Sequence, residues 1–396
     1  MNMPEIRFKD FKNEWKHFSF KEITYKAGIK NSENLSLESY SISNELGFIP
    51  QKEQFENGGT MSKADKRMYY IVSSNSFAYN PARINVGSLG YYQGIKDVIV
   101  SSLYEVFKTS DIVDDLFLLY WFKTNIFKRM IEQYQEGGVR LYFFFDKLQK
   151  CQIKIPSLQE QQKISSYFQK LDSLIQTTSK KLASLKRIKA ASLQSMFPQE
   201  GETVPKVRFK GFEGEWDFVT AGEVFRTTNV RNRPDLPVLS ATQDKGMVKR
   251  SDIGYQVFHD KSNETTYKHI LPGQFIIHLR SFQGGFAHSN IEGIVSPAYT
   301  VMEFKNKEFH YDYFWKYIFT SKEFIKRLEL ITYGIRDGRT ISFDEFKEMD
   351  FFIPSKLEQQ KIASYFCNLD KQISLQTQRL EKLKQIKAAC LDKMFV

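Results

Sequence analysis

Arginine, asparagine and glutamine side chains gather beside aromatic residues in several stretches of this sequence. The forked donors and acceptors of these residue types can hydrogen-bond to base edges, and neighbouring lysines and glycines suit contact with phosphates. In the first half of the chain the candidates are Lys63, Lys66, Arg67, Asn80, Arg83, Asn85, Tyr91 and Tyr92. In the second half they are Arg231, Arg233, Gln243, Lys245, Lys249, Arg280 and Gln283. The pattern indicates nucleic-acid contact, and ordinary polar loops are the alternative.

Motifs for catalysis or for binding a cofactor or metal are weak or missing. The segment 80–83, NPAR, lacks the second proline and the aromatic residue with which DNA methyltransferases grip a target base. No G-x-x-x-x-G-K-[ST] loop for ATP occurs, and no Asp/Glu-x-Lys of a nuclease core follows Pro234-Asp235 within about 30 residues. The histidines and cysteines have no metal-ligand spacing, and no nucleophile elbow supports a Ser/His/Asp triad. We therefore expect a non-catalytic chain without a cofactor or metal of its own.

Length, charge and cysteine content limit the class of protein. The 396 residues allow two or three domains, and the net charge of +11 favours a polyanionic partner such as nucleic acid. Residues 157–198 and 355–396 hold nine of the eleven surplus charges, so the rest of the chain is nearly neutral. Three cysteines without C-x-x-C spacing, and a longest apolar run of only 116–122, favour a cytoplasmic protein without a membrane span.

The chain contains an internal repeat that must position these residues. Residues 155–197 match 353–395 without a gap at about half of their positions, and residues 4–18 match 205–219. Between these markers identity nearly vanishes, although the order of features persists. We expect a first globular body over 1–155, a constant segment over 156–198, a second body over 199–352 and a second constant segment over 353–396. The polar stretch 198–205, which is bounded by prolines, is a natural linker.

Each constant segment predicts one long helix, with Ser157 and Ser355 as N-caps. Neither proline nor glycine interrupts 158–197 or 356–396, so each helix would be a rod of roughly 60 Å. Since one helix cannot bury its own apolar stripe, we expect an antiparallel coiled-coil pair with the bodies at opposite ends. The expected pairing residues are Ile164, Phe168, Leu171, Ile175, Leu182 and Leu185 with Ile362, Phe366, Leu369, Ile373, Leu380 and Leu383, and the stripe continues through Ile188 and Ile386.

Both bodies mix strand-like and helix-like stretches. Alternation predicts strands at 41–50, 97–107, 275–279 and 295–304, and longer apolar stretches predict helices at 116–136 and 311–330. The fold class is therefore α+β: two globular bodies joined by two long antiparallel helices, with a pseudo-two-fold internal repeat. A Gly-x-Arg loop follows each predicted body helix, and it contains Arg140 in the first copy and Arg336, with Arg339 close behind, in the second. Phosphate contact and a structural tie to the helix start explain these arginines about equally well.

On these motifs the chain resembles the specificity (S) subunit of type I restriction–modification systems. The resemblance rests on the segments 155–157, 160–164, 171–172 and 196–197, and on their copies 353–355, 358–362, 369–370 and 394–395. The pairs Arg7-Phe8 and Arg208-Phe209, followed by Trp15 and Trp216, look like the family's body openings. Family members typically show I-P-L-P before an E-Q motif, which is Glu160-Gln161 in the first copy and Glu358-Gln359 in the second. Here both copies lack the second proline.

The resemblance implies a concrete function. Each body would be a target recognition domain that reads one half of a split site in double-stranded DNA. The paired spacer helices would fix the gap and dock two modification subunits, which use S-adenosylmethionine to methylate adenine. Two restriction subunits would add translocation and cleavage driven by ATP and Mg²⁺. The S subunit itself would hold no catalytic residue, and its near-neutral bodies predict weak DNA binding by the isolated chain.

Two other classes of function remain open from the sequence alone. The first is a non-DNA adaptor with two ligand-binding bodies held on a coiled-coil spacer, which explains the repeat but not the Arg/Asn/Gln/aromatic loops. The second is an enzyme with an unrecognised site, which turnover by the purified chain would reveal.

Overall fold

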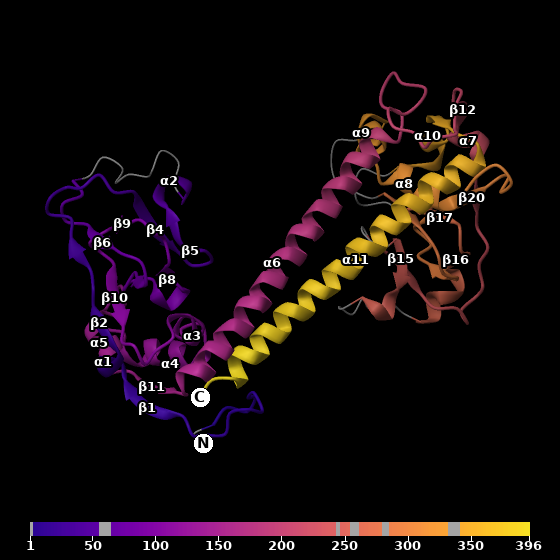
Figure 1. The fold of residues 1–396 in the computed structure, drawn as a ribbon. Helices are drawn as coiled ribbons and strands as arrows, with labels where there is room; N and C mark the ends of the chain where they lie inside the picture. Colours follow the sequence, from indigo (N-terminus) through magenta and orange to yellow (C-terminus); the bar gives the residue numbers. More distant parts are fainter. Residues whose placement is uncertain (1–2, 55–64, 243–245, 254–260, 279–284, 332–340) are drawn as a thin grey trace. The chain divides into compact units, whose positions relative to one another are not determined.

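The computed structural model describes residues 3–54, 65–242, 246–253, 261–278, 285–331 and 341–396 (Figure 1). It divides into two compact units: residues 1–178 with 379–396 form the first, and residues 179–378 form the second. The long helices α6 (Leu158–Ser195) and α11 (Lys356–Lys393), of 38 residues each, run through both units. Each unit therefore contains one body together with part of both helices. No helix of the described residues is long and apolar enough to cross a membrane.

The body of the first unit combines three sheets with short helices. Its sheets have the strand orders β2-β10-β7-β8, β3-β6-β9-β4-β5 and β1-β11, and β4 pairs parallel with β9 while the other pairs are antiparallel. The elements are β1 (Lys16–Ser19), α1 (Phe20–Ile23), β2 (Thr24–Lys26), β3 (Ile29–Lys30), β4 (Ser39–Ser43), β5 (Gly47–Pro50), α2 (Gln51–Gln54), β6 (Tyr70–Val72), β7 (Ser76–Tyr79), η2 (Ile84–Val86), β8 (Leu89–Tyr92), β9 (Val98–Val100), β10 (Glu105–Thr109), α3 (Asp115–Trp121), α4 (Asn125–Tyr134), α5 (Phe145–Lys150) and β11 (Gln152–Ile155).

The second unit repeats the central part of this plan. The sheet β13-β20-β17-β18 corresponds to β2-β10-β7-β8, and β12-β21 corresponds to β1-β11, while β14-β15 and β16-β19 form separate pairs. The elements are β12 (Asp217–Thr220), α7 (Ala221–Val224), β13 (Phe225–Thr228), β14 (Leu239–Thr242), β15 (Gly246–Lys249), η3 (Arg250–Asp252), η4 (Lys261–Thr266), β16 (Lys268–Ile270), β17 (Phe275–Ile277), β18 (Phe286–His288), β19 (Gly293–Val295), β20 (Thr300–Phe304), α8 (Asp312–Phe319), α9 (Lys322–Ile331), α10 (Phe343–Phe346) and β21 (Asp350–Ile353).

The α+β fold with two long antiparallel helices is confirmed, and so is the N-cap at Ser157, whose Oγ accepts from the Glu160 amide at 3.4 Å. The two predicted body helices are corrected, because each is a pair of shorter helices. Residues 116–136 divide into α3 and α4, since the Thr124 hydroxyl accepts from the Phe127 amide and starts a new helix. Residues 311–330 divide into α8 and α9, since Ser321 Oγ accepts from the Phe324 amide at 3.2 Å and starts a new helix.

Three of the predicted strands are also corrected, because each is a pair of strands. Residues 41–50 fold back on themselves as the β4–β5 hairpin, and 97–107 and 295–304 contain β9 with β10 and β19 with β20. Hydroxyl groups mark the breaks: Ser43 Oγ accepts from the Leu46 amide, and Ser101 Oγ accepts from the Leu103 amide. Short polar turns inside an alternating pattern do not interrupt its period. The sequence therefore predicts one strand where the structure has two strands joined by a turn. At 275–279, β17 ends at Ile277, and residue 279 lies outside the described part.

The helices run antiparallel to each other in both units. In the first, Tyr167 of α6 lies 3.4 Å from Cys390 Sγ of α11, and Lys387 Nζ donates to Asp172 at 2.5 Å. In the second, Ser192 and Tyr365 hydroxyls are 3.0 Å apart, and Lys189 Nζ donates to Asp370 at 2.5 Å.

A tyrosine of each body completes the charged contact between the helices. Tyr120 of α3 donates to Asp172 at 2.9 Å, and Tyr317 of α8 donates to Asp370 at 2.8 Å. Each aspartate therefore links the two long helices to a helix of the body, which is α3 in the first unit and α8 in the second. Partly buried polar contacts of this kind favour one register over its neighbours.

The stripe residues of the helices meet the bodies as well as each other. Ile164 and Phe168 belong to the core of the first body together with Met394 and Phe395 from the end of α11. Ile362, Phe366, Leu369 and Leu185 belong to the core of the second. Leu171, Leu182 and Leu380 are also buried, while Ile175, Ile373 and Leu383 are half-buried. Ile188 and Ile386 are exposed.

Candidate nucleic-acid interface

Buried polar contacts at the start of each long helix hold the bodies in place. Glu160, only 1 % exposed, receives two hydrogen bonds from the Arg7 guanidinium at 2.7 and 2.8 Å. Glu358, also 1 % exposed, receives the same pair from Arg208 at 2.7 and 2.8 Å. The hydrogen bond to each carboxylate raises the pKa of its arginine, so both guanidinium groups stay charged. The repeated Arg-Phe openings are thereby tied to the repeated E-Q motif.

The glutamine that follows each glutamate satisfies backbone groups of the body. Gln161 accepts from the Asp114 amide at 2.8 Å and donates to the carbonyls of Ile112 and Pro156. Gln359 accepts from the Tyr311 amide at 2.9 Å and donates to Phe309 and Pro354. Both side chains are fully buried. The E-Q motif therefore attaches each long helix to its body, and the side chains of the motif face the protein interior.

A polar hollow of about 510 Å³ lies on the body of the first unit. Its lining includes Asn80 and Arg83, two residues that the sequence places among the candidate readers. Around them lie the hairpin and helix residues Tyr40, Ser41, Ile42, Ser43, Asn44, Glu45, Gln51 and Gln54, and Tyr69, Ser88, Ser101 and Tyr104 complete the lining. Amide, guanidinium, hydroxyl and carboxylate groups thus converge on one concave surface, which is the chemistry that base edges require.

The loop that carries Arg83 is fixed by its own backbone. Asn80 Oδ1 accepts from the Ala82 amide, and the Asn80 carbonyl accepts from the Arg83 amide, both at 3.0 Å. The Ser88 amide donates to the Arg83 carbonyl, and the Ser88 hydroxyl donates to the Ile42 carbonyl of β4 at 3.1 Å. The Arg83 side chain remains exposed, and within the described residues it has no ion-pair partner. It is therefore available to a ligand.

A second hollow, of about 460 Å³, also borders the β4–β5 turn. Asn85 and Tyr91 line it together with Lys123, Asn125 and Lys128. The Tyr91 hydroxyl donates to Asp115 at 2.7 Å and lies 3.0 Å from Asn75 Oδ1, and burial together with the Asp115 contact raises the pKa of Tyr91. Tyr91 is therefore a neutral, fixed wall of this hollow.

The remaining candidates of the first body lie elsewhere. Tyr92 is buried against the rings of Tyr40 and Phe48, and its hydroxyl donates to the Lys96 carbonyl, so it supports the hairpin from within. Arg67 is exposed and pairs with Asp65 at 2.8 Å, beside Lys66. Arg140 is exposed in the loop between α4 and α5. Lys63 lies outside the described residues.

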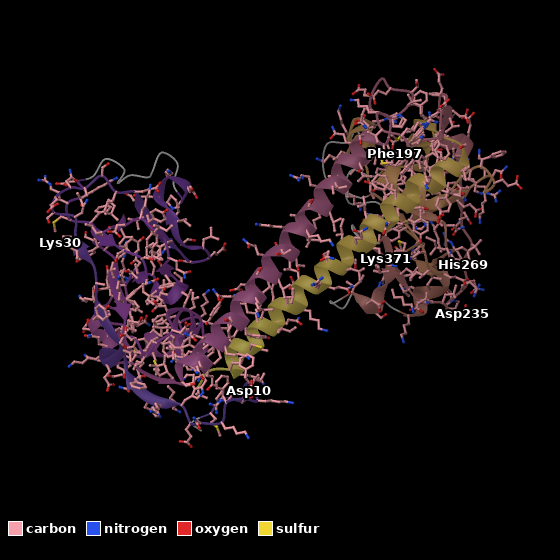
Figure 2. The ribbon with its side chains drawn as sticks, in the orientation of Figure 1. Asp10, Lys30, Phe197, Asp235, His269 and Lys371 are labelled. Atoms are coloured by element: carbon pink, nitrogen blue, oxygen red, sulfur yellow. The ribbon has the colours of Figure 1, made fainter. Side chains whose placement is uncertain are left out.

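The second body has fewer candidates that can be placed. Arg231 donates to Asn229 at 3.0 Å, and Arg233 pairs with Asp235, which Figure 2 labels, at 2.9 Å. Lys249 is exposed at the end of β15. The other candidates, Gln243, Lys245, Arg280, Gln283, Arg336 and Arg339, lie outside the described residues. The reading surface of this body therefore stays a prediction.

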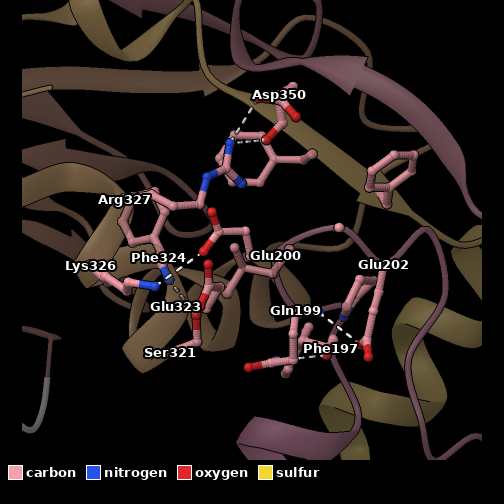
Figure 3. A pocket seen from close by; sticks show the side chains of 15 residues that line it. Phe197, Gln199, Glu200, Glu202, Ser321, Glu323, Phe324, Lys326, Arg327 and Asp350 are labelled. Carbon is pink, nitrogen blue, oxygen red and sulfur yellow. Dashed lines mark hydrogen bonds and ion pairs between the residues drawn. The ribbon is translucent and has the colours of Figure 1, made fainter. Parts of the chain in front are cut away.

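A hollow of about 310 Å³ lies where the linker after α6 meets the second body (Figure 3). Its floor includes Phe197 and Phe324, and on its rim Lys326 pairs with Glu200 while Arg327 pairs with Asp350. These charges neutralise one another, so the hollow, which the linker itself helps to line, offers no basic surface. The described residues contain no group of three or more His, Cys, Asp or Glu side chains that could hold a metal ion.

Comparison with known proteins bears on the whole chain. The family model described as "Type I restriction modification DNA specificity domain" matches residues 13–187 and again residues 213–385. No curated protein matches the sequence.

Solved structures share the fold at low identity. The S subunit of a type I restriction–modification system from M. genitalium is 15 % identical, with 100 % of this chain and 99 % of that chain covered and a TM-score of 0.59. A chain from a study of "complex assembly" and "conformational transition of the type I R-M system" is also 15 % identical, with 96 % and 97 % covered and a TM-score of 0.50. The HsdS subunit from Thermoanaerobacter tengcongensis, 15 % identical with 96 % of both chains covered, gives a TM-score of 0.48.

Proposed function

Because this chain belongs to the family of type I restriction-modification DNA specificity domains, we propose that it directs a type I restriction–modification complex to a bipartite DNA target. Each body reads one half-site in double-stranded DNA, and the paired helices set the gap between the half-sites. The observation that carries this proposal is that the contacts between helix and body are repeated while the two bodies differ in sequence. Both copies keep the Arg–Glu pair and the buried glutamine, whereas the bodies have diverged. Two unlike readers on a common frame suit an asymmetric split target.

The chemistry of the complex belongs to its other subunits in this proposal. Specificity subunits of this family are non-catalytic. We propose that two modification subunits dock on the paired helices and methylate adenine with S-adenosylmethionine. Two restriction subunits, with ATP and Mg²⁺, supply translocation and cleavage. The structural relative from the study of type I complex assembly supports a multisubunit setting.

The charge distribution indicates where the DNA affinity comes from. The surplus positive charge of the chain is concentrated in the two helix segments, and the bodies are close to neutral. Phosphate contacts supply most of the affinity in protein–DNA complexes and make it depend on salt. The isolated chain should therefore hold DNA weakly, and the complex with modification subunits should hold it well.

We expect the complex with the modification subunits to retain duplex DNA in a strongly salt-dependent way. If it contacts 6–10 phosphates, its affinity should fall about 10³- to 10⁵-fold between 50 and 200 mM salt. Filter retention of a labelled genomic fragment across this salt range measures the effect, with the isolated chain as a matched control. An assembled complex that retains no DNA at 50 mM salt would contradict the proposal and favour an adaptor that binds other ligands.

A further inference from the structure

The β4–β5 hairpin of the first body projects three consecutive exposed residues, Asn44, Glu45 and Leu46. Leu46 is 75 % exposed, although leucine is an unusual residue for the tip of a solvated turn. The hollow of about 510 Å³ and the hollow of about 460 Å³ are both lined by Asn44 and Glu45, so the tip borders both of them. A projecting turn bordered by hollows is complementary in shape to a groove bordered by raised walls.

The base of this hairpin is held firmly against strand β8. A Cβ atom added at Gly90 of β8 would lie 2.9 Å from the ring of Phe48 and 3.2 Å from Gly47 Cα, so only glycine allows this approach. Gly47 itself adopts a φ of +69°, which glycine adopts without strain. The Ser88 hydroxyl adds its hydrogen bond to the Ile42 carbonyl. The tip is therefore presented by a fixed support, as a reading element requires.

Opposite charges face the first hollow without pairing. Both Arg83 and Glu45 line it, and the structure records no ion pair between these two described residues. A protein that binds a polyanion has no electrostatic reason to place an unpaired carboxylate at its binding surface. The carboxylate is useful there if it accepts a hydrogen bond from a base, since the amino group of cytosine is a donor that Asp and Glu recognise. Arginine recognises the two acceptors of guanine in the same groove.

We propose that the β4–β5 hairpin is the major-groove reading element of the first body and that Arg83 and Glu45 read one G·C base pair. A two-stranded β-ribbon fits the major groove, which is about 12 Å wide. The second hollow then faces the DNA backbone, where Lys123, Lys128 and the amides of Asn85 and Asn125 suit phosphate contact. This inference rests on the proposed function, and it adds the element, the two residues and the base pair.

The test is the methylated motif of the host chromosome when the chain is replaced by Arg83→Ala or by Glu45→Gln. Matched controls are Arg129→Ala and Glu132→Gln, which change exposed residues of α4 outside both hollows. We expect either reader variant to relax one G·C position of one half-site, with discrimination reduced on the order of 5- to 150-fold. The other half-site and the gap should stay unchanged, and both control variants should keep the wild-type motif.

The possible outcomes separate this inference from the proposed function. An unchanged motif in both reader variants overturns the hairpin assignment, although the proposed function stands. If a variant abolishes methylation, its role is determined by measuring how its purified complex binds DNA duplexes that each carry a single base-pair substitution. Equal loss on every duplex makes the residue a phosphate contact and overturns the assignment, whereas lost discrimination at one G·C position supports it. A wild-type strain without any bipartite motif, despite an expressed modification subunit, contradicts the proposed function itself.

Discussion

Replacing Gln359 with leucine is expected to destabilise the second unit by about 3–4 kcal/mol. The fully buried amide makes three hydrogen bonds, to the Tyr311 amide and to the carbonyls of Phe309 and Pro354. Leucine has a similar size but leaves all three backbone groups without this partner. Each such loss costs about 1–3 kcal/mol, and three losses near the lower end of this range give the expected value. For a unit of 200 residues this corresponds to a melting temperature lower by roughly 6–16 °C.

Hydrogen exchange measured by mass spectrometry can assign this effect to one unit. Amides of α8 should lose protection, while those of α3 in the first unit should keep it. The adjacent Gln360 is exposed, so Gln360→Leu is a matched control that should change stability by no more than about 0.5 kcal/mol. Equal effects of the two substitutions would show that the buried glutamine does not hold the body to its helix.

Replacing Arg208 with alanine is expected to cost about 3–5 kcal/mol, because it leaves the carboxylate of Glu358 buried without its partner. The guanidinium also donates to the carbonyls of Gly214 and Glu213, so it holds the opening loop of the second body closed. Arg208→Lys should recover only part of this stability, because lysine cannot donate two parallel hydrogen bonds to one carboxylate. Chemical denaturation of the full chain measures these differences.

A double-mutant cycle distinguishes the cost of leaving the Glu358 carboxylate unpaired from the cost of losing the packing of the Arg208 side chain. The variant with both Arg208→Ala and Glu358→Leu should be more stable than Arg208→Ala alone, since it removes the unpaired carboxylate. Arg226 pairs with Glu303 at the surface, where its side chain is 61 % exposed, so Arg226→Ala should cost at most about 1 kcal/mol. A cost for Arg208→Ala as small as that of Arg226→Ala would refute the role of the buried pair.

The frame could be predicted from the sequence because it is periodic and repeated. Apolar residues at helical spacing extend over some forty positions in both copies, and neither glycine nor proline interrupts them. The roles of Glu160 and Gln161 could not be predicted, since their partners are far away in the sequence, at Arg7 and Asp114. The repeated Arg-Phe opening was the available signal, because it recurs together with the E-Q motif.

The contact of the candidate residues with DNA stays a prediction. Asn80, Arg83, Asn85 and Tyr91 were selected by residue type, and the structure places them along two neighbouring hollows. The tip residue Glu45 was missed, because acidic residues do not suggest DNA contact when charge alone is considered. Only the fold shows that Glu45 and Arg83 line the same hollow.

The break points inside elements were the least predictable part of the fold. Thr124 and Ser321 each start the second helix of their pair, because the hydroxyl oxygen accepts a hydrogen bond from the backbone amide three residues later. Apolar residues continue on both sides of these breaks, so the periodicity alone predicted one helix in each case. Local side-chain bonds to the backbone compete with the helix and decide the outcome.

The most direct test of the central claim is to sequence the host DNA for modified bases, with and without the gene for this chain. The expression of the modification subunit must be verified in both strains. One bipartite methyladenine motif should be present in the wild type, disappear completely in the deletion strain and return on complementation. An identical set of methylated motifs in both strains would contradict the claim that this chain selects the DNA target.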